Sequence, residues 1–129
     1  MHALLLCAVC ACSSNTPQRF SPAELSKNDR QLIGASIVVD GCIVWSRHGA
    51  AILSCDRGGE RRGLGLLDPN NQLGPAFGAI GALPFGGEIR AEVEGTVVVA
   101  KANPMNQTDD GLDTYLAVEK ILVPRPAGP

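Results

Sequence analysis

The chain has 129 residues, 45% of them hydrophobic, and its 11 basic and 13 acidic side chains give a net charge of −2. This length suits one small domain and is too short for two. A protein that binds duplex nucleic acid is expected to carry a basic stripe. Here the one basic cluster, Arg57, Arg61 and Arg62, is diluted by Asp56 and Glu60, so nucleic acid is not the expected partner.

A short apolar run opens the chain, and a polar segment, Ser13–Gln18, follows it. The run is shorter than the roughly 18 apolar residues that a membrane-spanning helix needs. Its end, Val9-Cys10-Ala11-Cys12, resembles the lipobox of bacterial lipoproteins, in which a branched apolar residue precedes two small residues and an invariant cysteine. The resemblance implies a signal peptide over residues 1–11, lipidation of Cys12 after cleavage, and a tether over residues 12–19. A buried first strand or helical turn is the alternative.

The same resemblance implies a cellular location. The mature protein would face the periplasm of a bacterial cell envelope and would be held to a membrane by its lipid. No Asp occupies the two positions after Cys12, which favours the outer membrane as the default destination.

The number of cysteines supports export. Five cysteines are present, and three of them lie in the leader. If Cys7 and Cys10 leave with the signal peptide and Cys12 carries the lipid, only Cys42 and Cys55 are left, and two cysteines in an oxidising compartment predict a disulfide. The pair Cys7-x-x-Cys10 has no second ligand pair that would complete a zinc site, so no metal is expected.

A helix is predicted at the start of the domain. Ser21 suits the N-cap, Pro22 the first helical position and Glu24 the third, which is the arrangement of a capping box. The helix is expected to run to about Gln31 and to end before Gly34.

From Ala35 onward the pattern changes to short β-strands separated by turns. The clearest alternation lies in the fourth strand, where Ile89, Ala91 and Val93 are expected to face the interior. Four or five strands, one helix and no βαβ rhythm favour a small antiparallel barrel. The strands are expected at residues 35–46, 51–55, 63–67, 88–100 and 114–123, with a polar loop at 103–113.

The first two strands are expected to form a hairpin with His48-Gly49 at the centre of its turn. Counting back from this turn sets Cys42 directly across from Cys55 at a non-hydrogen-bonded position, with Cα atoms about 4.5 Å apart. That spacing is at the short end of the range that a disulfide accepts. Trp45 alternates in register with Ile43 and is expected in the core. Two reduced cysteines on a hairpin of different register are the alternative.

Gly41 and Gly95 interrupt the first and fourth predicted strands, VVDGCIV and IRAEVEGTV, and an internal glycine lets a strand bend sharply. With the closing strand Leu116–Ile121, this order resembles the oligonucleotide/oligosaccharide-binding (OB) fold. The resemblance implies a mainly β domain over residues 20–124, a five-stranded barrel with a short N-terminal helix, followed by a C-terminal tail at 125–129.

The segment Leu73–Pro84 stands where the OB fold usually has a helix between its third and fourth strands. Its three glycines and two prolines favour a loop or a single helical turn instead. Phe77, Leu83, Pro84 and Phe85 are the candidate interaction surface, since an exposed apolar patch often marks a protein contact. A small satellite core under the loop is the alternative.

Patterns for catalysis and metal binding are incomplete. His48 falls in the predicted turn with no acidic partner on the same hairpin, so a role as general base is not expected. The polar loop fails as an EF-hand because its twelfth position is Ala117 instead of Glu. A weak site formed by Asp109, Asp110 and Asp113 is the alternative there, and no cofactor is expected.

The sequence therefore predicts a non-enzymatic, lipid-anchored binding domain of the cell envelope, whose partner is an envelope protein or a cell-wall component. An OB module that binds nucleic acid or oligosaccharide is the first alternative. Binding of single strands on this fold depends on aromatic side chains inside a positive groove, and the chain has few aromatic residues. A hydrolase whose site is assembled from scattered residues is the second alternative.

Overall fold

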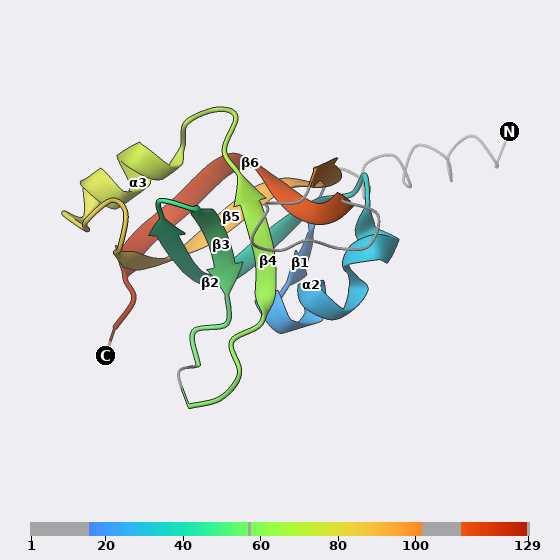
Figure 1. Ribbon diagram of the computed structural model, residues 1–129, viewed down its shortest axis with the longest axis horizontal. Helices are drawn as coiled ribbons and strands as arrows, with labels where there is room; N and C mark the ends of the chain where they lie inside the picture. The colour runs from blue at the N-terminus through green and yellow to red at the C-terminus, as the bar shows by residue number, and fades with distance from the viewer. Residues whose placement is uncertain (1–15, 57, 102–111, 129) are drawn as a thin grey trace, which may run out of the picture.

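The computed structural model describes residues 16–56, 58–101 and 112–128 and has a mainly β fold, as expected (Figure 1). The two α-helices lie on opposite sides of the strands. In chain order the elements are β1 (Gln18–Phe20), α2 (Pro22–Asn28), the 3-10 helix η1 (Asp29–Leu32), β2 (Ser36–Ser46), β3 (Gly49–Leu53), β4 (Gly63–Leu67), α3 (Leu73–Ala79), β5 (Glu88–Lys101) and β6 (Leu112–Pro126).

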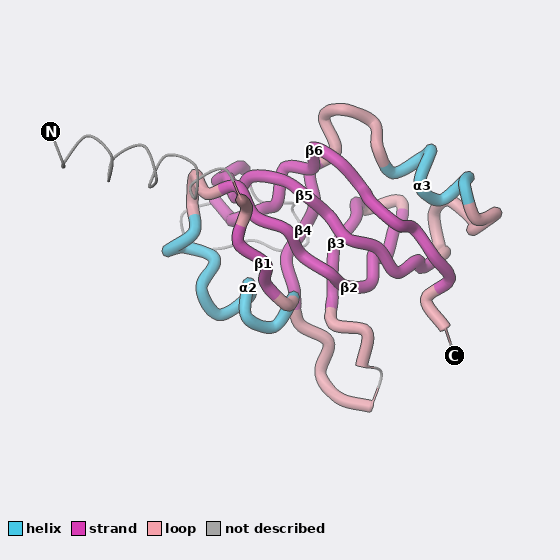
Figure 2. The backbone as a smooth tube through the Cα atoms, turned by 180° about the vertical axis from the view of Figure 1, so that it is seen from behind, coloured by secondary structure: helices cyan, strands magenta, loops and turns pink. Residues whose placement is uncertain are grey.

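The six strands form one sheet in the order β1-β2-β3-β4-β6-β5, and β2 pairs with β5 as well. The strands β2, β3, β4, β6 and β5 therefore make a ring of five. Figure 2 shows the two longest strands, β5 and β6, running side by side. The expectation of a wholly antiparallel arrangement is wrong, because β4 pairs with β6, and β1 with β2, in parallel.

Strand β2 is shared by both halves of the ring. It pairs with β5 over Ser36–Val44 and with β3 over Cys42–Ser46. At the junction, a Cβ on Gly41 would come within 2.6 Å of the ring carbon Cγ of Pro22 and within 2.9 Å of the carbonyl oxygen of Leu53. The absence of a side chain at Gly41 is therefore what lets α2 and β3 pack this closely against β2.

The interior of the ring is apolar, because alternate residues of each strand point inward. Leu25 of α2 and Phe77 of α3 add to this core and are almost fully buried. The prediction that Ile89, Ala91 and Val93 of the fourth strand of the ring, β5, face the interior is confirmed, since all three have no exposed surface. The other nearly inaccessible side chains of the core are Ile37, Val39, Ile43, Ile52, Val97, Leu116 and Val118.

The predicted capping box of α2 is confirmed. The Glu24 N–H donates to Ser21 Oγ at 3.1 Å, and the Ser21 N–H donates to Glu24 Oε1 at 2.9 Å. The bond that the Glu24 carboxylate accepts from the Ser21 N–H is the main cause of a lowered pKa of Glu24. The helix then tightens into η1, where the Asp29 carboxylate accepts a hydrogen bond from the Thr114 hydroxyl of β6. That bond ties the N-terminal helical segment to the last strand.

Both ends of the described chain carry strand where sequence analysis expects none. Gln18 and Arg19, assigned above to the tether, belong to β1 and pair with Ile37 and Val38 of β2. At the other end, β6 continues to Pro126, so the expected tail begins as strand. A three-residue strand is too short to show an alternating pattern, which is why β1 has no clear signal in the sequence.

The segment after β4 forms the seven-residue helix α3, not a loop or a single turn. The Asp68 carboxylate accepts from the N–H groups of Gln72 and Leu73 and so satisfies donors at the helix start. At the other end, Gly81 has a φ of +67°, and the N–H of Ala82 donates to the Phe77 carbonyl at 2.9 Å. This is a Schellman ending, and together the two caps offset the glycines and proline inside the helix.

Candidate functional site

The β2–β3 hairpin has a different register from the one predicted. Ser46 pairs with Gly49, so Arg47 and His48 are the turn residues, and the placement of His48-Gly49 at the centre is wrong. The Ser46 hydroxyl explains the difference, because it accepts from the His48 N–H at 3.2 Å and donates to the Gly49 carbonyl at 3.3 Å. These two bonds close the turn one residue earlier, and His48 is exposed there.

The predicted disulfide between Cys42 and Cys55 is present, with Cα atoms 5.2 Å apart. The two cysteines are not directly opposed, however. Cys42 pairs with Leu53, the last residue of β3, and Cys55 lies two residues farther along the chain. The bond therefore fastens the start of the β3–β4 loop to β2.

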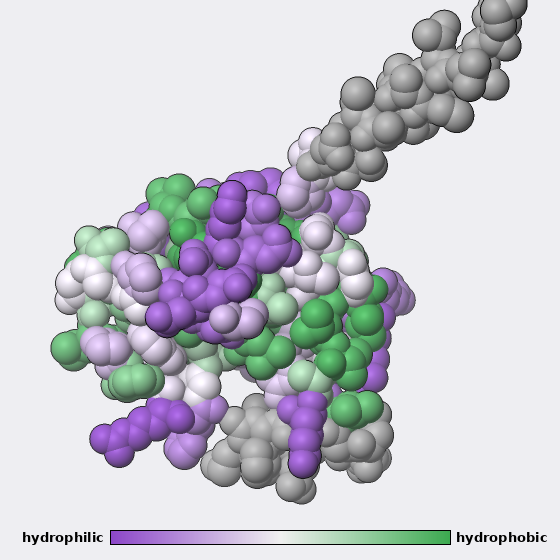
Figure 3. Space-filling model, turned by 90° about the horizontal axis from the view of Figure 1, so that it is seen from above, coloured by the Kyte–Doolittle hydropathy of each residue, from purple (hydrophilic) through white to green (hydrophobic). Residues whose placement is uncertain are grey.

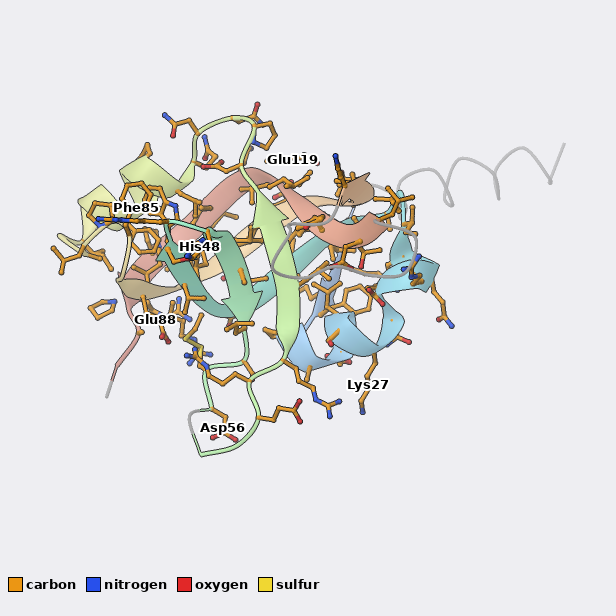
Figure 4. The ribbon with its side chains drawn as sticks, viewed as in Figure 1. Lys27, His48, Asp56, Phe85, Glu88 and Glu119 are labelled. Atoms are coloured by element: carbon orange, nitrogen blue, oxygen red, sulfur yellow. A yellow bond between two sulfur atoms is a disulfide. The ribbon has the colours of Figure 1, made fainter. Side chains whose placement is uncertain are left out.

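An arginine fastens the other arm of the same loop. Arg61 donates two parallel hydrogen bonds to the Glu88 carboxylate of β5, at 3.1 and 2.8 Å, and its Nε donates to the Ser54 carbonyl at 3.0 Å. The bonds to Glu88 are the main cause of a raised pKa of Arg61. The loop, whose tip carries Asp56, is thus attached to both β2 and β5 (Figure 4).

Three aromatic side chains meet at the end of β2. The Trp45 ring contacts Phe77 of α3, with ring centroids 5.1 Å apart, and Phe85, with centroids 4.7 Å apart. Phe77 is 1% exposed, whereas Phe85 is 59% exposed. Trp45, which the sequence predicts in the core, packs against the core but is only partly buried. The three aromatic side chains therefore form a continuous contact from the buried core, at Phe77, to the protein surface, at Phe85.

The loop before β5 is bound to β2 beside these rings. The Gly86 N–H donates to the Trp45 carbonyl at 2.6 Å, and the Trp45 N–H donates to the Gly87 carbonyl at 3.5 Å. Between these bonds and Leu83, Phe85 has a φ of +51°, a backbone conformation that residues other than glycine seldom adopt. Leu83 is 74% exposed even though two backbone hydrogen bonds attach its loop to β2 at Gly86 and Gly87.

Three of the four predicted interaction residues therefore lie on the surface: Leu83, Pro84 and Phe85, which we call the 83–85 patch. The fourth, Phe77, belongs to the core, because α3 turns it inward against Trp45. Seen from above, hydrophobic side chains gather toward both ends of the long axis (Figure 3).

A shallow groove of about 510 Å³ lies on the outer face of β2, β3, β4 and β6. Its floor is a row of residues paired across four strands, Val44, Ala51, Gly65 and Tyr115. The ring of Tyr115 lies against Gly65, where a Cβ would come within 2.8 Å of it. Lys101 also lines the groove. Sequence analysis misses this site, because the row exists only once the strands are in register.

The predicted lipidation site and most of the alternative acidic metal site lie outside the described residues. Cys12, Asp109 and Asp110 are outside them. Asp113 accepts from the Thr114 N–H at 2.9 Å. Within residues 16–56, 58–101 and 112–128, no three His, Cys, Asp or Glu side chains are grouped to hold a metal ion. The same residues include no helix that is long and apolar enough to span a membrane.

Comparison with protein-family models, curated proteins and solved structures gives no match. Function is therefore inferred from the residues and their geometry alone.

Reduction of the Cys42–Cys55 bond is expected to lower the free energy of unfolding by up to about 3 kcal/mol, because the bond restricts the unfolded chain. Urea denaturation of the purified protein with and without reductant measures this. A Cys42→Ala/Cys55→Ala variant is the control, since its midpoint should not respond to the reductant. Two free thiols in the protein purified without reductant, detected by mass spectrometry, would contradict the bond.

Proposed function

We propose that this protein is a non-enzymatic binding domain of the bacterial cell envelope, lipid-anchored through Cys12 and facing the periplasm. The Cys42–Cys55 disulfide supports export, because such bonds persist in oxidising compartments. The lipobox-like residues that end at Cys12 support the anchor, and with no Asp after Cys12 the outer membrane is the favoured membrane.

The 83–85 patch carries the proposal of binding. Apolar side chains exposed together often mark a contact with another protein. Here Leu83 and Phe85 are 74% and 59% exposed although their loop is fixed to β2 by two backbone hydrogen bonds. An anchored loop loses little conformational freedom when it binds, which favours affinity. The partner we propose is an envelope protein or a cell-wall component.

We further propose that the five-stranded ring is an OB-like barrel. Support comes from the strand β2, which pairs with both β3 and β5 and contains Gly41 at the junction. Further support comes from α3, which lies between the third and fourth strands of the ring, where the OB fold usually has a helix.

The groove favours a second candidate function, recognition of an oligosaccharide. Tyr115 supplies an aromatic ring on the floor of the groove, and Lys101 supplies a cation in its lining. A nucleic acid is less well served, because it needs several stacking rings in a positive groove. Of the five aromatic residues in the chain, Trp45, Phe77 and Phe85 are engaged with one another.

The anchor is tested by metabolic labelling with a fatty-acid analogue. The full chain is expected to incorporate the label, and Cys12→Ser is expected to lose it, because the thiol is the site of acylation. Cys7→Ser is the matched control and should keep the label. Equal labelling of the Cys12→Ser variant and the parent chain would contradict the anchor.

The binding surface is tested by placing a photo-crosslinking residue at Leu83 in the full chain within intact envelopes. Discrete crosslinked products are expected from this position, because its side chain is 74% exposed. Glu60, exposed in the β3–β4 loop, is the control position and should give none of them. Products that are the same at both positions, or absent at Leu83, would argue against the patch.

A further inference from the structure

A second apolar surface lies where the β5–β6 hairpin runs past the start of β2. Strand β2 begins at Ser36, opposite Thr96, while β5 continues to Lys101. The inward-facing series of β5 goes on beyond this point, where no residue of β2 pairs with it. Val97 is fully buried, but Val99, the next residue on the same face, is 40% exposed.

Two further apolar side chains extend this surface. Leu112 pairs with Lys101 at the end of the hairpin and is 42% exposed. Ile33 is 45% exposed and precedes Gly34, whose N–H donates to the Val97 carbonyl at 2.7 Å. We call the three residues Ile33, Val99 and Leu112 the apolar end.

The chain enters the domain at this same end. β1 runs parallel to β2 with Gln18 opposite Ile37, so the first described residue, Thr16, precedes the start of the pairing. Cys12 is four residues before Thr16, and four residues of chain span at most about 14 Å. A lipid on Cys12 would therefore hold the entry point of the domain within about that distance of a bilayer surface.

Exposed basic side chains beside the apolar end favour its docking on a negatively charged surface. Arg30 of η1 and Lys101 of β5 are both exposed beside it. Among the residues that the structure describes on η1 and at the start of β6, the Asp29 carboxylate accepts a hydrogen bond from the Thr114 hydroxyl, and the Asp113 carboxylate accepts one from the Thr114 N–H. Basic side chains beside apolar ones are the combination that binds anionic phospholipids.

We infer that the apolar end docks on a bilayer that contains anionic phospholipid, and that this contact orients the domain with the 83–85 patch directed away from the membrane. The inference rests on the proposed lipid anchor. Three apolar side chains bind a membrane weakly by themselves, but a covalent anchor keeps them at high local concentration beside it.

The test uses the lipidated full chain in vesicles of phosphatidylcholine and phosphatidylglycerol with brominated acyl chains, which quench tryptophan. Trp45, the one tryptophan of the chain, is replaced by Phe, and a new probe is introduced as Leu112→Trp or, in a second variant, Ile33→Trp. Emission from either probe is expected to fall when brominated lipid replaces ordinary lipid. Phe85→Trp in the same background is the control and should keep its emission.

Vesicle flotation of the same samples separates the two claims. Protein that floats but shows no loss of emission at either probe overturns the docked orientation and leaves the anchor intact. Protein that does not float overturns the anchor and the docking together. Equal quenching at the probe of Phe85→Trp also overturns the orientation.

Lys101→Gln removes one basic side chain beside the apolar end. It is expected to lower the ratio of docked to undocked protein about fivefold in vesicles with phosphatidylglycerol.

Discussion

The double pairing of β2 is the constraint on which the rest of the structure depends. One edge of this strand is bonded to β5 and the other to β3, and the two pairings overlap at Cys42–Val44. Gly41 stands directly before this overlap, and a Cβ there would come within 2.6 Å of Pro22 Cγ in α2 and 2.9 Å of the Leu53 carbonyl oxygen, so a larger residue would push α2 and β3 away from β2. Without the overlap, the five strands would form an open sheet and the apolar side chains inside the ring would face water.

Different parts of β2 hold the features from which the functional proposals are argued. Its end carries Trp45, to which the loop of the 83–85 patch is bonded. Its middle carries Cys42, whose disulfide fastens the β3–β4 loop. Its start pairs with β1, which fixes where the chain enters the domain. The patch and the chain entry are therefore separated by the length of one strand, and a domain anchored at the entry can present the patch to a partner.

Local patterns predicted what local interactions determine. The capping box at Ser21, the strand Gly63–Leu67 and the inward series of β5 agree with the structure, because each depends on neighbouring residues. The disulfide was predicted correctly from the number of cysteines, although the hairpin register used to place it was wrong, since the Ser46 hydroxyl decides the turn. The groove and the burial of Phe77 depend on strand order and on α3, which the sequence pattern does not reveal.

The central role of the β2 junction is tested most directly by the stability of Gly41→Ala. The added Cβ is expected to lower the free energy of unfolding by about 1–3 kcal/mol, as overpacking does. Gly78→Ala in α3 is the control, since its Cβ meets nothing within 4 Å and should raise the stability slightly. A Gly41→Ala protein that unfolds at the same urea concentration as the parent chain would contradict the account.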